Sequence, residues 1–271
     1  MDGLIGSARL YEWSPGLGTA WGDLLRWVSE TAGVAYEVIP RDVPMGLDEL
    51  WARGDMGCVA MCGYPWVLAA EPPRLLAAPV PAPPRYGDRP VYVSDFVVPA
   101  DSPFETLEDT FGHRFAYSTE HSQSGYNAAR YHLLRWRTAD RPSLFGDVLG
   151  PYMRQGAVLD ALAAGEADVA AVDGFALDLL RRHDPASAGR VRVVATTEAA
   201  PIPPMVTSLA EDDAGRRRLV DALLAFGAAP GMAATRDALL LDRFETVPPA
   251  VFDELIDRQR AAEEAGYAKI A

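Results

Sequence analysis

Short apolar runs alternate with amphipathic stretches along almost the whole chain. The apolar runs have the length of strands, and the amphipathic stretches have the length of helices. We expect strands over residues 4–13, 34–39, 56–61, 75–80, 91–98, 114–118, 168–172 and 191–196. Alternation of this kind is typical of α/β proteins, in which helices connect the strands of a parallel sheet.

The clearest helix is predicted over residues 19–32. Trp21, Leu24 and Val28 recur at intervals of three and four residues and therefore share one face. Gly33 follows the last apolar position, and a glycine in the left-handed conformation commonly ends a helix. The pattern thus predicts both the apolar face and the end of this helix.

Residues 102–112 carry the signals of a helix start. Ser102 is a suitable N-cap, Pro103 lies at the first helical position and Glu105 lies three residues after the cap. We therefore expect a helix here. The pattern of the last third of the chain predicts helices on an outer face over residues 211–231 and 248–266.

Two proline-rich breaks divide the chain. One spans residues 79–90 and the other residues 196–204, and each adjoins a strand-like run. Crossings between two lobes at these places would enclose a middle section of about a hundred residues. We therefore expect one lobe made of residues 1–88 plus 200–271 and a second, inserted lobe over residues 89–199, with two crossing segments.

Composition limits the possible functions. Apolar residues make up 49% of the 271 residues, which is enough for a large core, and no run approaches the roughly 20 apolar residues that span a bilayer. The net charge of -13 argues against broad nucleic-acid binding and against binding to an anionic membrane. The first residues do not resemble an export signal. The compartment is left open, extracytoplasmic if a signal has been removed and cytoplasmic otherwise.

Cys58 and Cys62 are the two cysteines of the chain. On one strand they would share a face but lie about 13 Å apart, which is too far for a disulfide. None of the four histidines lies beside them in the sequence, so the usual spacing of a zinc site is missing. We interpret both as small buried residues and expect no metal and no other cofactor.

Residues 118–136 combine several hydrogen-bonding side chains with the start of a helix. In open α/β sheets, ligands bind outside the carboxyl ends of strands, where helix starts present unpaired N–H groups. The hydroxyls of Ser122 and Ser124, with the N–H groups of Gly125 and Tyr126, would form a cradle for an oxyanion without any lysine or arginine. Simple N-capping by one of the two serines is the alternative.

His121 lies inside this loop, beside Glu120. A histidine next to hydroxyls and a carboxylate can act as a general base. The sequence contains no GxSxG elbow, no HExxH and no Walker-type motif that would recruit it. A histidine on a surface loop is the alternative interpretation.

The order and spacing of several motifs resemble one protein family. The loop Ser122-Gln123-Ser124-Gly125 is similar to the oxyanion loop of the phosphate, phosphite and phosphonate class of substrate-binding proteins. The resemblance spans most of the chain and implies the type 2 periplasmic-binding-protein fold, an α/β architecture of two Rossmann-like lobes. The other positions that match the pattern of the family are Gly54, Asp55, Gly63, Tyr64, Gly165, Asp168 and Asp173.

The chain departs from the family pattern at one place. Phosphonate binders of the family often carry a Ser-His pair at the start of the helix before a G-x-A-D motif. Arg154 and Gln155 stand at these positions, so an amide replaces the imidazole. Gln155 can donate a hydrogen bond to a ligand, and Arg154 either contributes charge or is a solvated residue at a helix end.

Four further candidates have two interpretations each. Tyr64 follows a strand and a glycine, and either closes over a ligand or packs in the core. Tyr11 and Trp13 end the first predicted strand, and either form an aromatic wall for an organic ligand or are ordinary core residues. Asp173 either accepts a hydrogen bond from a protonated oxyanion or an amine, or caps the following helix, or does both.

Two functions are consistent with these residues. The first is a receptor that captures a small anionic or polar ligand, such as a phosphate-like or phosphonate-like oxyanion or a small organic acid, by hinge closure of two lobes. Its partner would be the membrane permease of an ABC importer. The second is an enzyme on the same fold, similar to cytoplasmic proteins of menaquinone or thiamine-precursor synthesis. Fold alone does not decide between binding and catalysis, and we expect the receptor.

Overall fold

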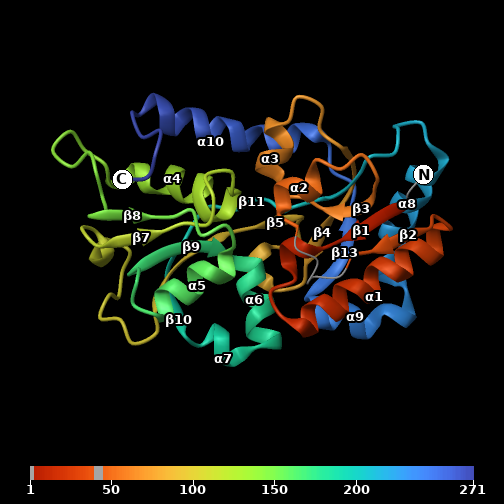
Figure 1. Ribbon diagram of the computed structural model, residues 1–271, viewed down its shortest axis with the longest axis horizontal. Helices are drawn as coiled ribbons and strands as arrows, with labels where there is room; N and C mark the ends of the chain where they lie inside the picture. The colour runs from red at the N-terminus through yellow and green to blue at the C-terminus, as the bar shows by residue number, and fades with distance from the viewer. Residues whose placement is uncertain (1–2, 40–44) are drawn as a thin grey trace. The chain divides into compact units, whose positions relative to one another are not determined.

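The computed structural model describes residues 3–39 and 45–271 (Figure 1). Its contacts divide the chain into two compact units. Unit 1 comprises Met1–Val91 and Pro201–Val251, and unit 2 comprises Tyr92–Ala200 and Phe252–Ala271. Each unit has a sheet covered by helices, which confirms the predicted α/β fold class.

Unit 1 contains a six-stranded sheet within the described residues, in the order β13-β4-β12-β3-β1-β2. The first three strands along the chain pair in parallel, whereas β12 and β13 pair antiparallel to their neighbours. The sheet is therefore mixed rather than purely parallel. Its strands are β1 Leu4–Ser7, β2 Tyr36–Val38, β3 Met56–Ala60, β4 Arg74–Pro81, β12 Met205–Thr207 and β13 Leu241–Glu245.

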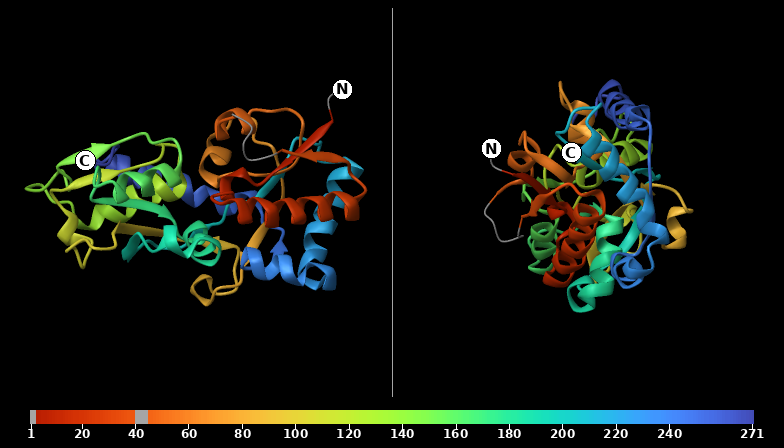
Figure 2. Two further views of the ribbon diagram at one scale, coloured as in Figure 1. Left: turned by 60° about the horizontal axis from the view of Figure 1, so that its bottom comes forward. Right: turned by 90° about the vertical axis from the view of Figure 1, so that its right-hand side faces the viewer.

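The helices of unit 1 lie on both sides of this sheet (Figures 1 and 2). They are α1 Pro15–Ala32, α2 Leu47–Trp51, α3 Gly63–Leu68, α8 Ala214–Ala225 and α9 Ala233–Leu239. Helix α1 starts four residues earlier than predicted, because the Ser14 hydroxyl caps it by accepting the N–H of Leu17. It ends as predicted at Gly33, which has a φ of 58°.

Unit 2 contains a five-stranded sheet in the order β10-β6-β9-β7-β8. β7 pairs in parallel with β8 and β9, and β6 pairs antiparallel with β9 and β10. Helices α4 and α10 lie on one face of the sheet, and α5 and α6 lie on the other (Figure 1). The strands are β6 Ser94–Pro99, β7 Arg114–Ala116, β8 Asp147–Leu149, β9 Val169–Asp173 and β10 Val191–Thr196. The helices are α4 Ala128–Leu133, α5 Gln155–Ala163, α6 Gly174–His183, α7 Pro185–Ala188 and α10 Asp253–Glu264.

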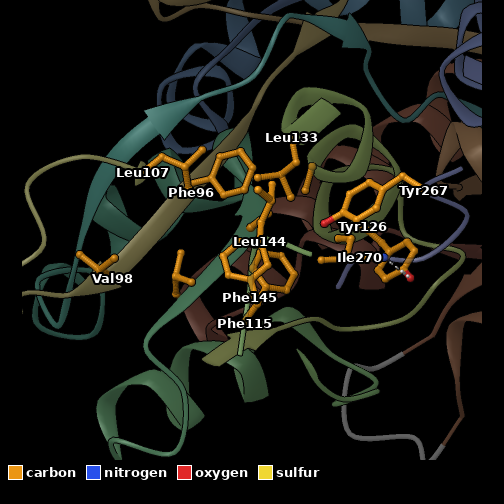
Figure 3. Packing of buried hydrophobic residues seen from close by; sticks show 13 residues of the cluster. Phe96, Val98, Leu107, Phe115, Tyr126, Leu133, Leu144, Phe145, Tyr267 and Ile270 are labelled. Atoms are coloured by element: carbon orange, nitrogen blue, oxygen red, sulfur yellow. Dashed lines mark hydrogen bonds between the residues drawn. The ribbon is translucent and has the colours of Figure 1, made fainter. Parts of the chain in front are cut away.

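The core of unit 2 joins sheet residues to the last residues of the chain. Phe96 and Phe115 come from strands, and Leu133 comes from α4. Tyr267 and Ile270 fill the same cluster (Figure 3). The end of the chain is thus part of this core, because burial of its apolar side chains stabilises the unit.

The predicted helix over residues 102–112 is wrong. Only a short 3-10 turn, Glu108–Thr110, forms there. The carboxylate of Asp109 accepts the N–H groups of Glu105 and Thr106, at 2.9 and 2.8 Å. Side-chain bonds of this kind compete with the helical hydrogen-bond pattern.

The predicted lobe boundaries fail at the C-terminus. The sequence pattern assigned residues 252–271 to the first lobe, but their contacts belong to unit 2. The chain passes between the units in β5 Val91–Tyr92 and β11 Ala200–Pro201, which pair in a two-stranded ribbon. It passes a third time between Val251 and Phe252, directly before α10. Two crossings were predicted, and the chain makes three.

The two cysteines are buried and form no disulfide, as expected. Cys58 lies in β3, and Cys62 follows the end of the strand and is the N-cap of α3. Burial raises the pKa of the Cys58 thiol to about 12, so this thiol stays protonated and unreactive at neutral pH.

Candidate ligand-binding site

The predicted oxyanion loop contains a π-helical turn, Gln123–Asn127. Ser122 is its N-cap, and the Ser122 hydroxyl accepts the N–H of Gly125 at 2.9 Å. Ser124 is buried within the turn. Turns of this type are rare and often occur at functional sites, because their hydrogen-bond pattern places side chains where a regular helix would not.

Gln155 connects this loop to a second candidate residue. It is the first residue of α5, and its amide Nε2 donates to the Ser124 hydroxyl at 2.9 Å. Its amide Oε1 accepts the N–H of Asp173 at 2.6 Å. Three predicted site residues, which are 31 and 18 positions apart in the sequence, therefore form one hydrogen-bonded cluster.

Within the cluster, both serine hydroxyls are hydrogen-bond acceptors. The hydroxyl oxygens of Ser122 and Ser124 each accept one hydrogen bond, from the Gly125 N–H and from Gln155 respectively. Neither hydroxyl donates to another of the residues that the structure describes. Each hydroxyl proton is therefore available to an acceptor atom of a ligand.

Asp173 is buried and has the capping role foreseen for it, while its contact with a ligand stays a prediction. It ends β9 and caps α6, where its Oδ1 accepts the N–H of Ala176 at 2.9 Å. Burial, together with the nearby carboxylate of Asp95, raises the pKa of Asp173 to about 7. At neutral pH the carboxyl is thus shared between its protonated and ionised forms, so it can donate to a ligand or accept from one.

Ser118 is a further residue of the cluster that the sequence analysis did not single out. A Cβ atom at Gly125 would lie 2.7 Å from the Ser118 hydroxyl and 3.0 Å from that of Ser122. Only glycine allows the turn to approach both hydroxyls so closely. The signal that could have found Ser118 is its place two residues after the end of β7, where ligands of α/β sheets bind.

Gln123 and Tyr126 have side chains directed into unit 2. The Oε1 atom of Gln123 accepts the amide of Asn127 at 2.8 Å, while its buried Nε2 has no partner among the described residues. The hydroxyl of Tyr126 accepts the N–H of Ile270 at 3.2 Å, and its ring lies 5.0 Å from that of Tyr117. The main-chain N–H of Tyr126 is the group that the sequence analysis assigned to the cradle.

His121 and Arg154 lie at the surface. His121 is exposed in the turn before Ser122. The neighbouring Glu120 carboxylate is paired with Lys269 at 3.0 Å, which removes the partner that a general base at His121 would use. Arg154 is exposed as the N-cap of α5, in agreement with its interpretation as a solvated residue.

Three aromatic candidates belong to unit 1. Tyr11 is buried and stacks on Trp21 with ring centroids 5.5 Å apart. Trp13 is half-buried, and its indole N–H donates to the carbonyl of Leu10. Tyr64 is buried in the first turn of α3. Their contribution to binding stays a prediction.

Asp168 and Asp55 match the family pattern but form ion pairs within their units. Asp168 accepts Nη2 and Nε of Arg114 at 2.8 and 2.9 Å and also its main-chain N–H. Asp55 is paired with Arg53. These bonds fix the ends of neighbouring strands and turns, which is a structural role.

Residues 3–39 and 45–271 contain neither a cluster of metal ligands nor a membrane-spanning helix. No group of three or more His, Cys, Asp or Glu side chains is arranged there to hold a metal ion. No helix in the same ranges combines the length and the apolar character that crossing a bilayer requires. The candidate ligand site is the hydrogen-bonded cluster of Ser124, Gln155 and Asp173, next to Ser122.

Comparison with known proteins identifies the family. A family model described as the periplasmic substrate-binding protein of phosphonate ABC transporters matches residues 12–252. The chain belongs to this family. The match confirms the resemblance seen in the sequence, and it favours the receptor over the enzyme of menaquinone or thiamine-precursor type. No curated protein matches the sequence significantly.

Several solved structures share the fold. A binding-protein component of an ABC phosphonate transporter from Pseudomonas aeruginosa has a TM-score of 0.81 at 17% identity, covering 97% of this chain and 87% of that one. PhnD1 from Prochlorococcus marinus, in complex with methylphosphonate, has a TM-score of 0.78 at 14% identity, covering 97% and 99%. A protein from Xanthomonas citri bound to ATP has a TM-score of 0.59 at 21% identity, covering 98% of each chain. At these identities the similarity establishes the type 2 periplasmic-binding-protein fold.

Proposed function

We propose that this protein captures a small phosphorus oxyanion, of the phosphonate, phosphite or phosphate class, at the Ser122–Gly125 loop and delivers it to an ABC permease. One observation carries the proposal. Gln155 is hydrogen-bonded to both Ser124 and Asp173, so the π-helical turn, the start of α5 and the end of β9 meet at one place, beside the hydroxyl groups of Ser122 and Ser124. Membership of the phosphonate-binding family supports both the ligand class and the permease partner.

The donors suit a tetrahedral oxyanion. Two hydroxyl protons, from Ser122 and Ser124, are available to ligand oxygens, whereas the Gly125 N–H already donates to the Ser122 hydroxyl. Hydrogen bonds from neutral donors to an ionised acceptor are about twice as strong as bonds between neutral groups. Several such bonds hold an anion without a direct ion pair.

The charges of the cluster favour a ligand with one negative charge. The hydrogen bonds of Ser122, Ser124, Gln155 and Asp173 involve no lysine or arginine among the described residues. A dianion here would face the Asp173 carboxylate whenever that group is ionised, and like charges repel. A monoanion with one protonated oxygen instead donates its proton to this carboxylate, so we expect protonated phosphonate or phosphate to bind best.

Titration calorimetry with four probes tests the proposal. Inorganic phosphate, phosphite, methylphosphonate and acetate are each titrated into the protein, and we expect at least one of the phosphorus oxyanions to bind. The Ser124→Ala variant should then weaken the tightest of these ligands about tenfold or more, because it removes one donor to a charged group. Gln155→Ala should act in the same direction, since Gln155 orients the Ser124 hydroxyl.

Ser102→Ala is the matched control. Ser102 also belongs to unit 2 and its hydroxyl also accepts a main-chain N–H, that of Phe104 at 3.3 Å, but it lies outside the cluster. This variant should bind like the unmodified protein. If Ser124→Ala and Ser102→Ala both keep the original affinity for the ligand, the site has been placed wrongly.

A further inference from the structure

The C-terminal segment Phe252–Ala271, here called the C-terminal strap, packs directly on the ligand loop. It belongs to unit 2 although the sequence pattern assigned it to the other lobe. Its helix α10 lies beside α4, the continuation of the π-helical turn (Figure 1). Ile270 donates its N–H to the Tyr126 hydroxyl, and Lys269 pairs with Glu120 on the other side of the loop. Figure 3 shows Tyr126, Tyr267 and Ile270 together at one side of the core.

Asn127 is the centre of the contact between the strap and the turn. It is fully buried and is the last residue of the π-helical turn. Its Nδ2 donates to Oε1 of Gln123 at 2.8 Å and to the carbonyl of Leu255 in α10 at 2.9 Å. Its Oδ1 accepts Nη2 of Arg130 at 3.0 Å. One side chain therefore links the start of the turn, the following helix and the strap.

Arg130 extends this network to the end of the strap. Its side chain is buried in unit 2, where Nη1 donates to the carbonyl of Ala268. The guanidinium also lies 5.7 Å from the centre of the Tyr126 ring. A buried cation needs partners, and the two Nη atoms find them in the strap and in the turn, whereas the buried Nε has no partner among the described residues.

We propose that Asn127 is a positioning residue for the ligand, which holds the π-helical turn in register by tying it to the C-terminal strap. Arg130 supports it through its bond to Oδ1. The inference rests on the proposed function, because it concerns the same donors. A π-helical turn is less favourable than a regular helix. Without the Asn127 bonds the turn relaxes toward the α-helical pattern, and the Ser122 and Ser124 hydroxyls no longer point at one ligand.

Three variants test this role by their affinity for inorganic phosphate and methylphosphonate and by their thermal unfolding. Asn127→Ala should lose about tenfold or more in affinity for the tighter probe. Asn127→Asp keeps an acceptor for Arg130 but loses the hydrogen bonds donated to Gln123 and Leu255. Its affinity should therefore fall about as much as that of Asn127→Ala, while it should unfold at a higher temperature than Asn127→Ala. Arg130→Lys keeps the positive charge but cannot bond Asn127 and Ala268 at the same time as the guanidinium does. Its affinity should fall less than that of either Asn127 variant.

Val98→Ala separates positioning from general stability. Val98 is fully buried in β6 within the same core, away from the loop. This variant should lower the unfolding temperature and keep the affinity within about twofold. The proposal is overturned if Asn127→Ala folds and binds as the unmodified protein does, or if Val98→Ala loses as much affinity. Should Asn127→Ala not fold, unchanged affinity in both Asn127→Asp and Arg130→Lys overturns it.

The outcome for Ser124→Ala distinguishes this inference from the proposed function. If Ser124→Ala loses affinity and the Asn127 variants do not, the loop binds the ligand without help from the strap and only the positioning role fails. If neither loses affinity, the ligand binds elsewhere and the proposed function fails as well.

Discussion

Replacing Asp173 by asparagine should make the ligand-free protein more stable, by an amount that grows with pH. Asparagine caps a helix about as well as aspartate, so the bond to the Ala176 N–H is expected to survive. The substitution removes the titrating group and leaves the volume of the side chain nearly unchanged. The resulting change in stability therefore reports the cost of an ionised carboxylate at this buried position.

The magnitude follows from the pKa of Asp173. Burial raises this pKa from 3.8 to about 7 in the folded protein. A difference of this size corresponds to about 4 kcal/mol of unfolding free energy. Below pH 3.8 the carboxyl is protonated in both states and has no effect. Between pH 3.8 and about 7 the folded state holds a proton that the unfolded state has released, so stability falls as pH rises and then levels off.

Urea unfolding at pH 5 and pH 8 measures the effect. The stability of Asp173→Asn relative to the unmodified protein should increase by about 2.5 kcal/mol between these two pH values. Asp184→Asn is the control, because Asp184 also caps a helix, α7, with its side chain accepting the N–H of Ser187. Its hydrogen bonds to Ser187 lower the pKa of Asp184 below 3.8. The stability difference for Asp184→Asn should therefore not change from pH 5 to pH 8.

A stability difference for Asp173→Asn that stays constant between pH 5 and pH 8 would refute this reasoning. It would mean that Asp173 titrates in the folded protein as it does in the unfolded chain. The same variant should bind protonated phosphorus oxyanions more weakly, because a neutral amide oxygen accepts a hydrogen bond from the ligand less strongly than a carboxylate does. Higher stability combined with weaker binding is the usual consequence of removing a functional buried charge.

Two further predictions concern backbone positions. Gly125→Ala should abolish detectable binding of the tightest phosphorus oxyanion in calorimetry and lower the free energy of unfolding by about 1–3 kcal/mol, because the added Cβ would lie 2.7 Å from the Ser118 hydroxyl. Unchanged affinity would mean that the turn does not approach Ser118 as described. Met153→Gly should raise the free energy of unfolding in urea by about 1 kcal/mol, because Met153 has a φ of 65°, a conformation that is unfavourable for residues other than glycine. A lower free energy of unfolding would show that the exposed Met153 side chain stabilises the protein by more than this strain destabilises it.

The loop and its residue types were predictable because they depend on neighbours in the sequence. Ser122 caps the turn by reaching Gly125, three residues away, and Gly33 ends α1 at the residue where the apolar pattern stops. Such bonds form within a few residues, so spacing alone predicts them. The same holds for most of the strands, whose apolar runs are short and continuous. Local signals failed at residues 102–112, where the Asp109 carboxylate offered the main chain a competing partner.

The partners of the loop depended on the tertiary structure. Nothing in the sequence showed that Gln155 would bond Ser124 and Asp173. Ser124 follows β7, Gln155 follows β8 and Asp173 ends β9, so the three residues meet only because these strands are neighbours in the sheet, in the order β9-β7-β8. Ser118 became part of the site only through its approach to Gly125. The raised pKa of Asp173 likewise depends on burial by residues from other elements.

The sequence by itself determined the α/β class, the C-terminal end of α1 and the polar loop before Gly125, because these depend on periodicity and on hydrogen bonds between near neighbours. Only the tertiary structure decided that Phe252–Ala271 belongs to unit 2 and that the Leu255 carbonyl accepts the side-chain amide of Asn127. The physical reason is that burial of apolar surface has no direction. An amphipathic helix such as α10 shows which of its faces is apolar, but not which sheet that face will cover.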